Sequence, residues 1–106
     1  MNKAVILIGS NDNKVMMINK LCEAVKQCCQ VLATSSVYES KAVGQYAGVS
    51  PHYLNQAFLI AHNRTAQELK EKLLRPLEIQ FGVPKVKKIY VKADIDIVLT
   101  DDMNGV

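Results

Sequence analysis

The chain has 106 residues, of which 49% are hydrophobic and 22% charged, and its formal net charge is +3. This length favours one compact domain, residues 1–106, and the apolar runs are far shorter than the roughly 20 residues that a membrane span needs. The N-terminus lacks a signal-peptide pattern, so we expect a cytoplasmic protein. Arginine and aromatic residues are too few to favour nucleic-acid binding. The three cysteines form neither a CxxC pair nor a zinc spacing and are expected to be reduced.

The N-terminal region predicts a strand followed by a helix. Residues 4–8 form a continuous apolar run that ends at Gly9, which suits a strand buried on both faces. The stretch SNDN then offers several side chains that can cap a helix. Apolar residues recur at steps of three and four from residue 18 to residue 29, which indicates one amphipathic helix of about four turns.

Two further strands flank a long loop in the middle of the chain. Residues 31–40 are rich in β-branched and hydroxyl side chains and predict the second strand. The stretch KAVGQYAGVSP has no periodicity, and its length suggests a binding role. Residues 53–61 predict the third strand.

A second helix follows the third strand. Thr65 and Glu68 fit a capping box at its start, and Gly82 is placed to end it. Pro76 lies inside the pattern and predicts a kink or an early break, because proline has no backbone N–H to donate.

The last predicted strand covers residues 89–99, where apolar and mostly polar positions alternate. The predicted order is therefore βαββαβ. Each β-α-β crossover is expected to be right-handed, which places both helices on the same side of the sheet. We expect an α+β, ferredoxin-like fold with a four-stranded antiparallel sheet and two helices on one face.

Asp94 and Asp96 lie on the polar side of this last strand and should point onto the open face of the sheet. With Cα atoms roughly 7 Å apart, two bare carboxylates would repel by about 2 kcal/mol at an effective dielectric of about 20. A divalent cation would remove this repulsion, so the pair is a candidate binding site for a magnesium-bound triphosphate. The alternative is a half-solvated strand with ordinary charged positions.

Tyr53 and Asn55 share one face of the third strand for the same reason. An aromatic ring beside an amide that both donates and accepts hydrogen bonds suits a flat heterocycle. Cross-strand packing by Tyr53 and a structural hydrogen bond by Asn55 remain open.

Five stretches occur in order along the chain: ILIGSN, SSVYES, YLNQAF, LKEKLLRPLEIQFG and DIDIVL. Together they resemble 6-hydroxymethyl-7,8-dihydropterin pyrophosphokinase (HPPK) of folate biosynthesis, over nearly the whole chain. The resemblance implies a ferredoxin-like kinase that transfers the pyrophosphoryl group of ATP to the hydroxymethyl oxygen of the pterin and releases AMP. It also implies two Mg²⁺ ions, held by Asp94 and Asp96.

The resemblance also assigns substrate-binding positions. Asn55 and the backbone near Ser40 and Val43 match positions that contact the pterin, and Tyr53 matches an aromatic position that supports them. The implied partners are thus the dihydropterin and ATP.

On the nucleotide side, Glu78 falls where the family has an acidic helix residue. Lys85 and Lys92 stand in the region where the family usually carries arginines, and a lysine does not reproduce the bidentate arginine fork. The family also continues past the aspartates with a segment that covers ATP, whereas this sequence ends ten residues after Asp96. We therefore expect a short form of the enzyme with slow transfer at best.

Two hypotheses of different classes remain open. The first is a compact, ATP-dependent pterin pyrophosphokinase. The second is a non-catalytic ferredoxin-like module, either a ligand binder or a subunit whose site is completed by a second copy or by another chain.

Overall fold

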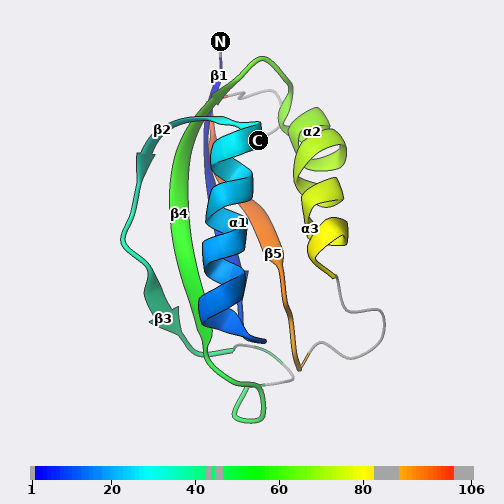
Figure 1. Cartoon of the computed structure of the whole chain (residues 1–106). Coiled ribbons are helices and arrows are strands. Elements are labelled where there is room, and N and C mark those ends of the chain that lie inside the picture. The colour runs from blue at the N-terminus through cyan, green and yellow to red at the C-terminus, as the bar shows by residue number, and fades with distance from the viewer. Residues whose placement is uncertain (1, 43, 45–46, 83–88, 102–106) are drawn as a thin grey trace.

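The structure, a computed structural model, describes residues 2–42, 44, 47–82 and 89–101 (Figure 1). The strands are β1 (Asn2–Ser10), β2 (Gln30–Thr34), β3 (Tyr38–Ser40), β4 (Tyr53–His62) and β5 (Asp94–Thr100). The helices are α1 (Lys14–Cys28), α2 (Ala66–Leu69), the π-helical turn η2 (Lys70–Leu74) and α3 (Arg75–Phe81).

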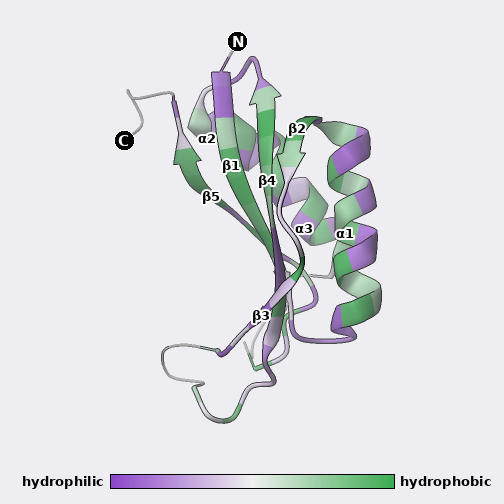
Figure 2. Cartoon of the chain, turned by 90° about the vertical axis from the view of Figure 1, so that its left-hand side faces the viewer, coloured by the Kyte–Doolittle hydropathy of each residue, from purple (hydrophilic) through white to green (hydrophobic). Residues whose placement is uncertain are grey.

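All strand pairs in the sheet are antiparallel, in the order β2-β4-β1-β5, and β3 also pairs with β4. Both helical segments lie on one side of this sheet, as Figures 1 and 2 show. The predicted α+β, ferredoxin-like architecture is therefore confirmed. The sheet contains five strands instead of the predicted four.

The additional strand arises because the predicted strand over residues 31–40 is divided into β2 and β3. At the division, the Ser35 N–H donates to the Ala57 carbonyl, and the Ala57 N–H donates to Ser35 Oγ instead of to a backbone carbonyl. The Gln56 side chain donates a hydrogen bond from Nε2 to the Ser35 carbonyl. Side-chain hydrogen bonds thus replace some of the backbone hydrogen bonds between the strands. Serine often competes with secondary structure in this way, because its hydroxyl can bond to nearby backbone groups.

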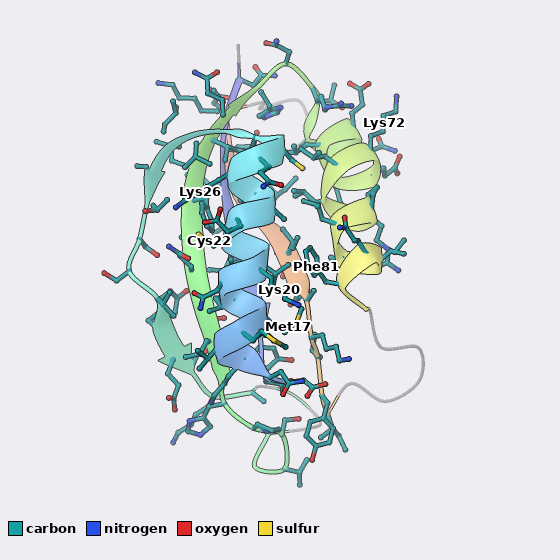
Figure 3. The ribbon with its side chains drawn as sticks, viewed as in Figure 1. Met17, Lys20, Cys22, Lys26, Lys72 and Phe81 are labelled. Atoms are coloured by element: carbon teal, nitrogen blue, oxygen red, sulfur yellow. The ribbon has the colours of Figure 1, made fainter. Side chains whose placement is uncertain are left out.

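The hydrophobic core lies between the sheet and the two helical segments. Strands β1 and β4 contribute Ile6, Ile8, Phe58 and Ile60, each of which is fully buried. The helices cover them with the apolar residues Ile18, Leu21, Val25, Leu69, Leu74 and Leu77. Figure 3 shows Phe81 between α1 and α3, whereas Lys72 points outward.

The start of α1 differs from the prediction. Its N-cap is Asn13, in the left-handed conformation at φ 50°, and no side chain caps the helix. The predicted capping role of the preceding polar residues is therefore wrong for this helix. Asn11 uses its side chain elsewhere, as described below.

The second helical segment begins and ends as predicted. The Thr65 hydroxyl accepts from the Glu68 N–H while the Thr65 N–H donates to the Glu68 carboxylate, and Gly82 ends the segment at φ 94°. Pro76 does not break the run. Instead the turn before it is π-helical, a widening that fits the missing N–H and the bulk of the proline ring.

The last strand starts at Asp94 and not at residue 89 as predicted. Its register with β1 shifts near Val5, which pairs with Leu99, while the neighbouring Ile6 pairs with Ile97. The extra residue, Val98, breaks the strict alternation, as a β-bulge does. Leu99 is therefore 67% exposed instead of facing the core.

No helix in the described part of the chain has both the length and the apolar character to cross a membrane. The three cysteines, which all lie within that part, are free thiols.

Candidate active site

The strand register places three residues side by side across the middle of the sheet. Gly9 of β1 pairs with Asn55 of β4 on one side and with Asp94 of β5 on the other. Directly paired residues on antiparallel strands share a face of the sheet. The amide and the carboxylate therefore flank the glycine on the open face, away from the helices.

Gly9 is needed here because its neighbours approach closely. A Cβ atom on this residue would lie 3.0 Å from Asn55 Oδ1 and 3.6 Å from Cδ2 of Tyr53. Both side chains can rest against the bare backbone only because no side chain is present. The first contact is tighter than ordinary van der Waals distance, so any larger residue would push the amide away.

The amide of Asn55 is held in place from the neighbouring strand β3. Its Nδ2 donates to Ser40 Oγ at 2.8 Å and, more weakly, to the Tyr38 carbonyl at 3.4 Å. The residue is only 7% exposed. Because its nitrogen is engaged, Oδ1 is the group directed toward the space beside Gly9.

Tyr53 is the aromatic residue of this group and lies next to Gly9. Burial raises the pKa of its hydroxyl, and the charge of Asp94 raises it further. The ring lies against the bare backbone of Gly9, and its Cδ2 would be 3.6 Å from a Cβ atom there, so it covers part of β1. The aromatic ring of Tyr53 and the amide oxygen of Asn55 thus both lie next to Gly9.

Three carboxylates meet at the start of β5. Burial raises the pKa of Asp94 to about 6, and the charges of Asp96 and Glu78 contribute to the increase. Glu78 reaches this point from α3, where it is 8% exposed, and its Oε2 accepts the Ile95 N–H at 2.8 Å. Arg75, at 3.4 Å from Oε1, is its cationic partner.

This arrangement fits a divalent cation on its donor chemistry. Without a cation, Asp94 is a partly buried carboxylate beside two others, and bound positive charge would offset that repulsion. Within the described residues, no group of three or more His, Cys, Asp or Glu side chains is arranged to hold a metal alone. Asp94 and Asp96 would therefore share a Mg²⁺ ion with water and phosphate oxygens, as Mg²⁺ prefers.

The structure brings most of the predicted site residues to this end of the sheet. The pterin-side residues Ser40, Tyr53 and Asn55 lie in contact with one another or with Gly9. Lys92 lies beside the end of α3, where its Cδ would be 3.5 Å from a Cβ on Gly82.

Two predicted positions, Val43 and Lys85, lie outside the described residues.

Two residues of this region were not predicted as part of it. The sequence alone identifies Gly9 only as the end of a strand, because its place between Asn55 and Asp94 depends on the pairing of β1 with two strands distant in sequence. The sequence alone suggests Asn11 only as a helix cap, yet it is 4% exposed and contacts two distant loops. Both belong to the stretch ILIGSN, so the motif was the available signal.

A comparison with known protein families identifies a matching family. The family model described as 7,8-dihydro-6-hydroxymethylpterin-pyrophosphokinase (HPPK) matches residues 5–104. No curated protein matches the chain. The matched range includes the glycine, the amide and the carboxylates described above.

Proposed function

The chain belongs to the 7,8-dihydro-6-hydroxymethylpterin-pyrophosphokinase family, and we propose that it catalyses the transfer of pyrophosphate from ATP to the pterin. The members of this family are pterin pyrophosphokinases of folate biosynthesis that use ATP and Mg²⁺. In the proposed reaction, the hydroxymethyl oxygen of 6-hydroxymethyl-7,8-dihydropterin attacks the β-phosphorus of ATP, and AMP leaves. Residues 1–106 are proposed to act as one domain.

The row Asn55–Gly9–Asp94 is the observation that carries this proposal. It separates a heterocycle-binding amide from a metal-binding carboxylate by two strand spacings, roughly 10 Å. A pterin whose ring edge meets Asn55 would direct its hydroxymethyl group toward Asp94. The acceptor oxygen and the metal-bound phosphates would then meet above β1, which is the positioning that such a transfer requires.

Each pterin-side residue has a proposed role. Asn55 Oδ1 accepts a hydrogen bond from an N–H on the ring edge, and Ser40 holds the amide in that orientation. Tyr53 offers its face for stacking. The backbone at Val43 is proposed as a further pterin contact by resemblance to the family.

On the nucleotide side, Asp94 and Asp96 are proposed to hold Mg²⁺, two ions in the family's pattern, which would neutralise the charge of the triphosphate. Glu78 fixes the start of β5 through the Ile95 N–H. Lys85 and Lys92 are proposed to face the phosphates. Because lysines stand where arginines would stabilise charge bidentately, we propose that transfer is slow.

Calorimetric titration tests the binding part of this proposal. We expect the dihydropterin to bind, and a non-hydrolysable ATP analogue to bind only with Mg²⁺. Asn55→Ala should lower pterin affinity by roughly 1 to 3 kcal/mol, because the ring's polar edge is left unpaired. Absence of pterin binding to the unmodified chain would remove the proposal and leave the non-catalytic module.

A further inference from the structure

Asn11 is a buried polar residue that ties together two loops from distant parts of the chain. It follows β1 directly and is 4% exposed. Its Nδ2 donates to the Ile89 carbonyl at 2.8 Å and to the Pro51 carbonyl at 3.3 Å. Its Oδ1 accepts the Val91 N–H, and its own backbone N–H donates to the Val91 carbonyl at 2.9 Å.

The two loops held by Asn11 lead directly into the candidate site. Pro51 lies two residues before Tyr53, where β4 begins, and Val91 lies three residues before Asp94, where β5 begins. The segment from residue 89 to residue 93 forms no strand pairing, although Val91 and Ala93 are buried. The side chain of Asn11 thus supplies partners to backbone groups that a neighbouring strand would otherwise pair.

We propose that Asn11 is a positioning residue that sets the distance between the two halves of the active site. By holding both loops to one amide, it fixes Tyr53 and Asn55 relative to Asp94 and Asp96. This inference rests on the proposed function, because the distance matters only if the two halves hold reacting partners. Misplacement of reacting groups by about 1 Å can cost about 100-fold in rate.

The chemistry of asparagine explains why this residue type can hold both loops. Its planar amide offers two donor hydrogens and one acceptor oxygen, and the observed bonds use both ends of the group. Alanine would remove all of them. Aspartate would keep the acceptor for the Val91 N–H, but it has no donor for the carbonyls of Ile89 and Pro51.

Asn2→Ala provides a matched control. Asn2 lies at the opposite end of β1, and its Nδ2 donates to the Arg64 carbonyl at 2.9 Å, a bond that also joins distant parts of the chain. Its loss tests the general effect of removing such a bond without touching the site. An effect that appears in Asn11→Ala but not in Asn2→Ala is then due to the location of the Asn11 bonds beside the site.

Steady-state kinetics is the first arm of the experiment. Asn11→Ala should lower kcat by about 100-fold, while KM for the dihydropterin and for MgATP stay within about threefold. Asn2→Ala should leave kcat unchanged. An active parent chain together with an unchanged kcat in Asn11→Ala, per folded molecule, would overturn the positioning role.

Amide hydrogen exchange is the second arm and needs no turnover. In Asn11→Ala, exchange should rise together in peptides covering residues 51–55 and 89–96, and in Asn2→Ala it should rise in neither. Asn11→Asp is the milder variant should alanine prevent folding. It should keep Val91 protected and release the segment 51–55.

The two arms separate failure of the inference from failure of the proposed function. An inactive parent chain would contradict the function alone, and exchange would then decide whether one amide joins the two loops. Faster exchange in only one segment of Asn11→Ala, or in neither, would overturn the inference even if the parent chain is active. Release of Val91 in Asn11→Asp, with the segment 51–55 still protected, would also overturn it.

Discussion

The carboxyl group of Asp94 has a pKa of about 6 because it is partly buried and lies beside the charges of Asp96 and Glu78. The ordinary pKa of this group is about 4. A carboxyl whose pKa is higher in the folded chain stabilises the fold below the unfolded pKa. That contribution is lost as the pH rises through the folded pKa. At neutral pH, Asp94 therefore lowers the free energy of unfolding of the metal-free chain.

Asp94→Asn should accordingly stabilise the metal-free chain above pH 6 by about 1 to 2 kcal/mol, after allowance for partial solvent exposure. The difference from the unmodified chain should shrink toward zero below pH 4. Urea unfolding at pH 4 and pH 8, with a chelator present, measures it. A variant that is less stable at pH 8, or a difference that does not depend on pH, would contradict this account.

Gly9 gives a second prediction for a single residue. A methyl group at this position would lie 3.0 Å from Asn55 Oδ1, and the bond from Asn55 to Ser40 opposes any retreat. Gly9→Ala should therefore lower pterin affinity by at least about tenfold, which is about 1.4 kcal/mol. Calorimetric titration with the dihydropterin measures the loss.

A double-mutant cycle shows whether that loss passes through the amide. When Asn55→Ala is already present, the close contact no longer exists, so adding Gly9→Ala should change pterin affinity little. Fully additive losses would mean that the glycine acts by another route.

At the scale of elements, the contact between α3 and β5 contributes to the raised pKa of Asp94, after burial and the charge of Asp96. Glu78 accepts a hydrogen bond from the Ile95 N–H at the edge of β5, and its charge also raises the pKa of Asp94. Glu78→Gln keeps an oxygen that can accept the Ile95 N–H but removes the charge. The pKa of Asp94 should fall, so binding of Mg²⁺ with the ATP analogue should persist to lower pH.

The pH dependence of this binding, followed by calorimetry, distinguishes the charge of Glu78 from its hydrogen bond. Glu71→Gln is the matched control, because Glu71 lies on the exposed side of the same helical segment and pairs with Gln67. A midpoint that stays in place, or moves to higher pH, in Glu78→Gln would contradict the assigned coupling.

The elements that the sequence predicts well are those whose cause is local. The apolar periodicity of α1 and the capping box of α2 depend on neighbours within a few residues, and both elements form. The division of β2 from β3 depends on Ser35 meeting Ala57, and the late start of β5 depends on Asn11 meeting Val91. These partners are far apart in sequence, so no local pattern reveals them.

The candidate site follows the same rule. Period-two alternation predicts that Tyr53 shares a face with Asn55 and that Asp94 shares one with Asp96. The position of Gly9 between the two pairs requires the register of three strands. The places of Val43 and Lys85 remain predictions.

At the scale of the whole molecule, the site is assembled where several strands and the end of the second helical segment meet. Residues of β1, β3, β4 and β5 contribute from one face, and Glu78 of α3 contributes at the edge. Neither half has a chemical function without the other, because a heterocycle site and a metal site react only when they hold their ligands at a fixed separation. The central claim is therefore catalytic coupling of the two halves.

Release of AMP from ATP by the purified chain tests that claim most directly. We predict release that requires both the dihydropterin and Mg²⁺, that is lost in Asp94→Asn and in Asp96→Asn, and that proceeds well below the median enzyme turnover of about 10 per second. Turnover near that median would refute the proposed slow transfer. AMP release that is absent at saturating substrates, or that does not depend on the dihydropterin, would contradict the account itself.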